Sequence, residues 1–255
     1  MTEINNGSTR RDFGGLLLGT LAGLSFALTS CDDSAKKNSL VELKLPAPIR
    51  EALGRVQQAY DASSGETFTS KSYYAAASLL SDLPIQKIEQ TRTVLDSAGV
   101  PNFDPRSILA ASSAISGIPV EDYTKAFLDV HQRKSHFAAA SILAATAVSC
   151  GKPVSELEAA YAQVTSNNRF ISRSVLASAA AVSGKSVPEV EAIYQQISVT
   201  ESLASRAILA RAVAVTGISV DLAQDVYRSV SCTNSFEAKA ILAEAAIIKA
   251  TKSES

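Results

Sequence analysis

Residues 170–194 read FISRSVLASAAAVSGKSVPEVEAIY, and this stretch decides the fold. Apolar residues recur at helical spacing through its first half, as at Phe170, Leu176 and Val182, which marks one face of a helix. Gly184 then supplies a residue that readily takes the left-handed conformation in which helices often end. A second apolar and acidic run follows at once. The stretch therefore predicts a helical hairpin.

The same hairpin recurs along the chain from about residue 46 to the end. Its reference pair stands at Tyr73-Tyr74, Ile108-Leu109, Ile142-Leu143, Val175-Leu176, Ile208-Leu209 and Ile241-Leu242. Six residues before the second member of each pair stand Phe68, Phe103, Phe137, Phe170, Leu203 and Phe236. Eight residues after it stand Asp82, Gly117, Gly151, Gly184, Gly217 and, in the last copy, Ala250. This regular spacing, with a period of 33–35 residues, identifies a repeat protein.

The second helix of each hairpin has its own start signals. Prolines follow the turn in three copies, at Pro84, Pro119 and Pro153, where a missing N–H costs nothing in a first helical turn. Two serine–glutamate pairs have the spacing of a capping box, Ser155 with Glu158 and Ser186 with Glu189. Acidic residues recur where the helix dipole is positive, at Asp122, Glu156 and Glu189. Each copy therefore predicts two helices joined by a tight turn.

Together these signals predict an all-α fold over residues 46–255. Residues 48–60 form an initial helix that is equivalent to the second helix of a hairpin. Residues 236–250 form a final helix that is equivalent to the first helix of a hairpin, so we expect about twelve helices. A single hairpin cannot bury its apolar face, so the copies stack into an α-solenoid. The period is similar to that of the tetratricopeptide class. The Trp-Leu-Gly-Tyr spacing of that class is absent, as is the Thr-Pro-Leu-His of ankyrin, so the sequence indicates no repeat family.

The amino-terminal 31 residues resemble a two-part export label. Thr9-Arg10-Arg11-Asp12-Phe13 resembles the twin-arginine motif, and Leu28-Thr29-Ser30-Cys31 resembles the lipobox of bacterial lipoproteins. The 16 residues 13–28 are mostly Leu, Gly and Ala. At about 1.5 Å per residue they fall short of a hydrocarbon core roughly 30 Å thick. They fit the apolar centre of a signal peptide better than the remaining alternatives, an uncleaved membrane anchor or a chance match.

The resemblance implies a location. Residues 1–30 are then a signal peptide that is removed, and Cys31 is the first residue of the mature protein and carries lipid. Residues 31–45 are polar and without periodicity, and they form a flexible linker between the lipid and the repeat domain. Asp32-Asp33 resembles the signal for staying on the periplasmic face of the cytoplasmic membrane. The twin-arginine route carries folded proteins, which implies a domain that folds in the cytoplasm.

Composition narrows the function classes. The chain has 24 Lys and Arg against 25 Asp and Glu, so no global field attracts nucleic acid, and we expect no nucleic-acid partner. It has no Trp and two histidines, His131 and His136, which make a poor metal site. No nucleotide fingerprint, catalytic triad order or carboxylate pair is visible, so we expect no cofactor and no enzyme activity. Cys150 and Cys232 lie more than two repeats apart, and we expect no disulfide between them.

One repeat position carries a cation in five of six copies. This ladder consists of Lys71, Arg106, Arg173, Arg206 and Lys239, and the third copy has Ala140 at this position. Two roles remain open: the side-chain stems cover neighbouring rings with some cation–π gain, or the row binds an anion. Ten residues beyond the glycine position stand Arg92, Phe127, Tyr161, Tyr194 and Tyr227. The four aromatic members of this row are either core or the lining of a binding groove.

Three functions remain after these exclusions. The leading one is a membrane-tethered, non-catalytic scaffold that binds a protein partner, since stacked repeats offer large surfaces. The second is a module that binds an anionic polymer or peptide through the ladder. The third is an enzyme of a class that the sequence does not identify.

Overall fold

The computed structural model describes residues 45–100, 103–133 and 136–253. Arg10, Arg11, Cys31 and nearly all of the expected linker lie outside the described residues. Within the described ranges the chain forms twelve helices and no strand. This confirms the predicted all-α fold of helical repeats.

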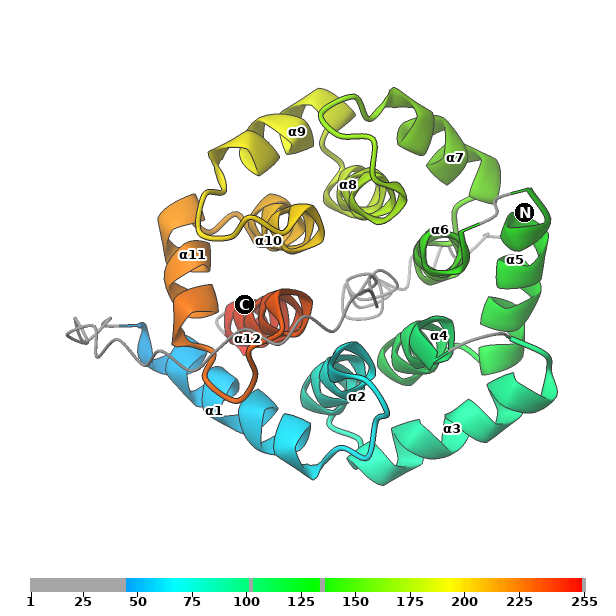
Figure 1. Cartoon of the computed structure of the whole chain (residues 1–255), viewed down its shortest axis with the longest axis horizontal. Helices are drawn as coiled ribbons and strands as arrows, with labels where there is room; N and C mark the ends of the chain where they lie inside the picture. Colours follow the sequence, from blue (N-terminus) through cyan, green and yellow to red (C-terminus); the bar gives the residue numbers. More distant parts are fainter. Residues whose placement is uncertain (1–44, 101–102, 134–135, 254–255) are drawn as a thin grey trace, which may run out of the picture.

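The helices alternate between two concentric layers (Figure 1). The inner layer, whose helices are seen end-on, consists of α2 (Phe68–Ser81), α4 (Phe103–Ser116), α6 (Phe137–Cys150), α8 (Phe170–Ser183), α10 (Leu203–Thr216) and α12 (Phe236–Ser253). The outer layer consists of α1 (Ala47–Ala62), α3 (Ile85–Ser97), α5 (Val120–Arg133), α7 (Val154–Gln163), α9 (Val187–Gln196) and α11 (Val220–Ser229). Each inner helix begins at the predicted Phe or Leu position.

Left-handed residues separate inner from outer helices at the predicted positions. Gly184 ends α8 with φ of 71°, and Gly117, Gly151 and Gly217 have the same conformation. A Cβ atom at Gly184 would meet nothing within 4 Å, so the backbone angle and not crowding favours glycine there. Asp82 takes the left-handed conformation in the first hairpin, with φ of 56°. The last copy has Ala250 at this position, and α12 continues past it to Ser253.

The starts of the outer helices differ in part from the prediction. Ser186 and Glu189 form the predicted capping box of α9. Ser155 and Glu158 do not, because Pro153 occupies the N-cap of α7 and Ser155 lies inside its first turn. Glu158 instead accepts a hydrogen bond from Arg133 Nε at 3.4 Å.

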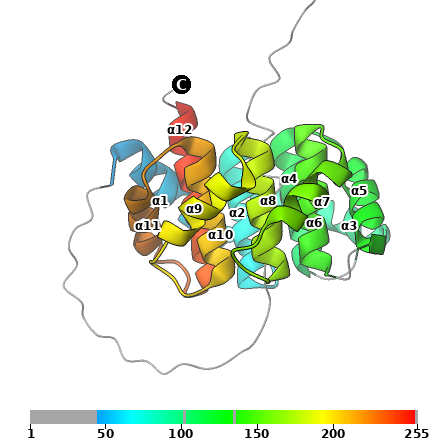
Figure 2. The ribbon, with the colours of Figure 1, turned by 90° about the horizontal axis from the view of Figure 1, so that it is seen from above.

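The two ends of the solenoid meet. The carboxyl-terminal helix α12 packs against both α1 and α2, so the six hairpins form a closed ring (Figures 1 and 2). The helix expected over 48–60 supplies the outer partner of α12, and the last hairpin is therefore made from both ends of the chain. Gln57 of α1 accepts hydrogen bonds from the backbone N–H groups of Ser231, at 2.8 Å, and Cys232, at 3.3 Å. This contact between α1 and the α11–α12 loop is called the seam below.

The core lies between the two layers. All six reference pairs are buried. The row Phe127, Tyr161, Tyr194 and Tyr227 is buried with them, so these residues belong to the core and do not line a groove. Arg92 does not share this position: α3 is three residues longer than α7, and Leu95 is the fully buried residue near its end. Arg92 pairs instead with Glu66. Among the helices within residues 45–253, none combines the length and the apolar character that a bilayer span needs.

The ring has two distinct ends. All inner helices begin at one end, called the amino rim, which carries Phe68, Phe103, Phe137, Phe170, Leu203 and Phe236. They finish at the other, called the turn end, which carries Asp82 and the four left-handed glycines named above. Helix α12 finishes at the turn end, and α1 begins there, as the other outer helices do (Figure 2). The start of α1, which follows the expected linker in sequence, therefore lies at the turn end.

Candidate functional site: the amino rim of the inner ring

The ladder cations lie between the two layers and contact the outer helices. Arg173 donates from Nη2 to the carbonyl of Tyr161 at 2.9 Å, and its guanidinium carbon lies 4.4 Å from the centroid of the Tyr161 ring. Arg206 repeats this geometry on Tyr194, at 3.2 Å and 4.6 Å. Both carbonyls belong to the last turn of an outer helix, where a positive charge is favourable. Each arginine thus stabilises a helix end and covers a ring.

The other members of the ladder follow the same plan with variations. Lys71 and Lys239 each place Nζ 5.8 Å from the centroid of a tyrosine ring, Tyr60 and Tyr227 respectively. Arg106 lacks a tyrosine; its Nε donates to the carbonyl of Val100 at 2.6 Å, and it pairs with Asp96 at 2.5 Å. All five side chains are half-buried. This geometry favours the structural alternative over an anion-binding stripe.

The histidines contact aromatic rings. His131 lies between Phe127 and Phe137, with ring centroids 5.6 Å and 4.3 Å away. His136 is the N-cap of α6, and its Nδ1 accepts from the N–H of Ala139 at 3.4 Å. Burial lowers the pKa of His136, which keeps the ring neutral at pH 7. In the described part of the chain, no three His, Cys, Asp or Glu side chains gather as metal ligands do.

The amino rim exposes aromatic side chains, although periodicity predicts that Phe170 shares one apolar face with Leu176 and Val182. Phe68 is 64% exposed, Phe170 53% and Phe236 55%, while Leu176 and Val182 of the same helix as Phe170 are buried. The reason is position. Each Phe is the first residue of its helix, and helical side chains lean toward the amino terminus, so the ring extends past the end of the layer that would cover it. The capping residues Thr67 and Ser235, directly before Phe68 and Phe236, were the signal that could have placed these rings at a helix start.

A cavity of about 400 Å³ opens at this rim beside Phe170. Its lining comes from the starts of α6, α8 and α10, namely His136, Arg169, Phe170, Ile171, Ser172, Ser202, Leu203 and Ala204. The rings of His136 and Phe170 stack, with centroids 5.3 Å apart. The walls are largely apolar, and the lining includes one cation and no carboxylate. Its volume is typical of cavities that hold small ligands or peptide ends, about 300–1,000 Å³.

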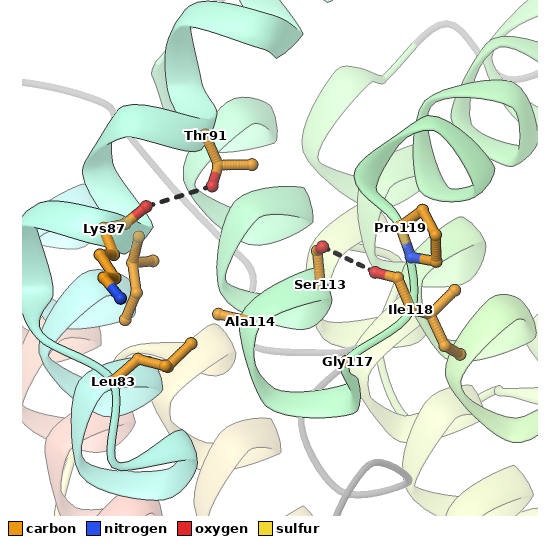
Figure 3. A pocket seen from close by; sticks show the side chains of 9 residues that line it. Leu83, Lys87, Thr91, Ser113, Ala114, Gly117, Ile118 and Pro119 are labelled. Atoms are coloured by element: carbon orange, nitrogen blue, oxygen red, sulfur yellow. Dashed lines mark hydrogen bonds between the residues drawn. The ribbon is translucent and has the colours of Figure 1, made fainter.

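A second cavity, of about 300 Å³, lies near the turn end between α3 and the α4–α5 turn (Figure 3). Its hydroxyl groups are already used by the backbone. Ser113 donates to the carbonyl of Ile118 at 2.7 Å, and Thr91 donates to the carbonyl of Lys87 at 3.4 Å. Lys87 is the one charged residue in the lining of this cavity.

No protein-family model, curated protein or solved structure matches this chain. Its function must therefore be inferred from its own geometry.

Other chemically notable groups in the described part of the chain are structural. Arg211 of α10 and Glu244 of α12 are fully buried and form a bidentate ion pair, with Nε to Oε1 at 2.6 Å. Burial raises the pKa of Glu244, and the facing guanidinium opposes this shift. Cys150 and Cys232 are not joined by a disulfide, as expected, and burial raises the pKa of each thiol to about 11. Thiols of such high pKa are protonated near neutral pH and are poor nucleophiles.

Proposed function

We propose that this protein is an exported, membrane-tethered lipoprotein that acts as a non-catalytic scaffold and binds a protein partner through its amino rim. The observation that supports this proposal best is the set of exposed Phe68, Phe170 and Phe236 at one end of the ring. Phe68 and Phe236 lie at the starts of the neighbouring helices α2 and α12, and Phe170 lies at the same end of the ring on α8. Exposed aromatic side chains are typical of protein–protein interfaces, where they supply much of the binding energy.

The position of the tether supports the same surface. The linker joins the ring at the turn end, so a lipid on Cys31 holds that end toward the membrane. Its 15 residues, 31–45, are long enough to let the ring move but attach it from one side. The amino rim is then the end of the ring opposite the tether and is open to a partner.

Location is tested with two changes in the export label. Replacing Arg10 and Arg11 with Lys should block export, because the twin-arginine route requires the pair. Cys31→Ala should leave the protein without lipid. Metabolic labelling with a fatty acid measures the second effect, and a labelled Cys31→Ala protein would show that the lipoprotein proposal is wrong.

The interaction surface is tested by a pull-down from native membranes, with partners identified by mass spectrometry. A rim variant changes Phe68, Phe170 and Phe236 to Ser. Its matched control changes three exposed apolar residues elsewhere, Leu83, Val94 and Leu128, to Ser. We expect the rim variant to lose the partner and the control to keep it. Equal recovery by both variants would exclude the rim as the binding surface.

A further inference from the structure

We propose that the cavity at the amino rim binds the carboxyl terminus of a peptide chain that ends in an apolar residue. This inference rests on the proposed scaffold function and names the chemistry of the partner. It starts from an unusual helix end. The N-cap of α8 is Arg169, and no side chain caps the first-turn N–H groups of this helix.

Other inner helices that begin at the rim satisfy these groups themselves. In α2, Thr67 and Ser70 form a reciprocal capping box. In α10, Ser202 accepts from the N–H of Ser205, at 3.3 Å. The start of α8 therefore leaves donors for an outside acceptor, and the helix dipole makes an anion the favoured one.

A buried hydroxyl beside the same helix end gives independent support. Ser172 is 1% exposed, lines the cavity, and its Oγ has no hydrogen-bond partner. Ser70 occupies the same helical position in α2, and its hydroxyl contacts the N-cap Thr67. Ser172 has no such contact. Ser205 of α10 also lacks one although Ser202 caps that helix, but of these two unpartnered hydroxyl residues it is Ser172 that lines the cavity. An unsatisfied buried donor is costly, and an acceptor bound in the cavity would remove that cost.

The charge and the walls of the cavity select the kind of anion. Arg169 adds a positive charge, and no carboxylate lines the cavity. Phe170, Leu203 and Ala204 supply apolar surface next to the donors. A carboxylate attached to an apolar group matches both parts, since backbone N–H groups and a hydroxyl can bind its oxygens while the apolar group contacts the walls. A peptide ending in Leu or Phe presents this combination, and the partner of a protein-binding scaffold can present such a carboxyl terminus.

The test uses the full-length protein in detergent and the fluorescence anisotropy of fluorescein-labelled peptides. One pair ends in Ala-Leu and Ala-Phe with free carboxylates, and a second pair is identical but amidated. We expect the free acids to bind and the amides to bind at least about tenfold more weakly, because hydrogen bonds to a charged group are lost. Equal binding of acids and amides would overturn the proposal, as would the absence of binding by all four peptides.

Three variants locate the site. Ser172→Ala should weaken binding of the free acids about tenfold, and Arg169→Gln should weaken it and reduce its dependence on salt. Ser205→Ala is the matched control: Ser205 is the equivalent residue of α10, is fully buried with an unpartnered hydroxyl, and does not line the cavity. It should bind as the unchanged protein does. Thermal melting checks that all three variants fold, and unchanged binding by Ser172→Ala and Arg169→Gln would contradict the assignment.

Two further experiments are needed. One distinguishes a peptide carboxylate from that of a small acid, and the other distinguishes the cavity proposal from the scaffold proposal. If 3-phenylpropionate binds as tightly as the peptides, the ligand is a small acid and the peptide assignment is wrong. A variant with Phe68 and Phe236 changed to Ser, both outside the cavity, reports on the rim alone. Loss of the native partner in this variant without peptide binding by the unchanged protein would support the scaffold and refute the cavity. Peptide binding by the unchanged protein, together with normal recovery of the native partner by this variant, would support the cavity and refute the rim as the scaffold surface.

Discussion

The seam between α1 and the α11–α12 loop can be compared with the junction between α9 and α11, which lie in consecutive repeats. At the seam, Gln57 Oε1 accepts from the N–H groups of Ser231 and Cys232. At the internal junction, Gln224 Oε1 accepts from the N–H groups of Ser198 and Val199, both at 2.9 Å. The same side chain thus caps the same loop, although Gln57 and Ser231 are 174 residues apart and Gln224 and Ser198 are 26 apart.

Glutamates make the same contact at other junctions. Glu191 accepts from the N–H groups of Thr165 and Ser166, and Glu89 accepts from that of Ser64. The seam is therefore an ordinary repeat junction whose two sides are distant in sequence. Ring closure needs no special contact; it needs a sixth outer helix, which the amino-terminal segment provides.

The strongest test introduces a buried charge on each side of this comparison. Val56 of α1 and Val190 of α9 are both fully buried, and each lies four residues before a tyrosine of the buried row or its equivalent, Tyr60 and Tyr194. Val56→Asp and Val190→Asp should each cost more than about 5 kcal/mol, because the carboxylate has no buried partner. Hydrogen exchange should show α1 and α12 opening first in one variant, and α8 to α10 in the other. Simultaneous loss of protection throughout the ring in both variants would show that the junctions are not separable.

The second test concerns the ion pair in the last inner junction before the seam. Glu244→Gln should destabilise the protein by about 3–5 kcal/mol, because it leaves the Arg211 guanidinium buried without its counter-charge. Replacing both residues with Met should cost much less. Chemical denaturation measures both. An internal junction supplies the control: Thr146 and Ser178 share a hydrogen bond of 2.6 Å between α6 and α8, and Ser178→Ala should cost about 1 kcal/mol.

The third test removes ladder charges from three internal junctions. Replacing Arg106, Arg173 and Arg206 with Gln should cost about 3 kcal/mol in total, roughly 1 kcal/mol for each residue, because all three lose a hydrogen bond, Arg173 and Arg206 lose a cation–π contact, and Arg106 loses its ion pair. The melting temperature should fall while recovery of the partner per folded molecule stays the same. Unchanged stability with lost, salt-sensitive binding would restore the anion-binding alternative.

A smaller effect compares the two glutamines directly. Gln57→Ala and Gln224→Ala should each cost about 1–2 kcal/mol, because two loop N–H groups lose their acceptor. If the seam is equivalent to an internal junction, the two values agree within the error of the measurement. Labelling of Cys232 with a thiol reagent gives a local readout. It should become faster in Gln57→Ala, while labelling of Cys150 does not change.

The smallest expected effect is a pH dependence of the stability that arises at His136, the N-cap of α6, and not at the Gln57 contact of the seam. Because burial lowers the pKa of His136, its neutral form is favoured in the folded protein. Its contribution to stability is complete above the unfolded pKa of about 6.5 and is lost as the pH falls through that value toward the folded pKa. The slope cannot exceed about 1.4 kcal/mol per pH unit for one proton. His136→Asn keeps a capping side chain and should flatten this part of the stability profile measured by denaturation.

Much of this architecture was predictable because its determinants are local. Gly184 and its equivalents marked the turns, and Ser186 with Glu189 marked the start of α9. The pairing of Arg173 with a ring was one of two expected roles. Closure was not predictable, since it depends on the rotation between hairpins summed over six copies, and no short stretch encodes that sum. The exposure of Phe170 was missed because periodicity assigns a face but not the point where the covering layer ends. The cavity needed the starts of three helices brought together, which only the folded chain shows.

Closure also has a consequence for the order of events during synthesis. Helix α1 leaves the ribosome first, but its partner α12 is the last helix to be made. At about 5–20 residues per second, the interval of 174 residues between Gln57 and Ser231 lasts roughly 10–35 s. Throughout this time α1 can pack against α2 but lacks its second partner, α12, and the proposed export label lies just ahead of it. A transport route that accepts only folded cargo would therefore act on completed chains, because the contact between α1 and α12 forms only after α12 has been made.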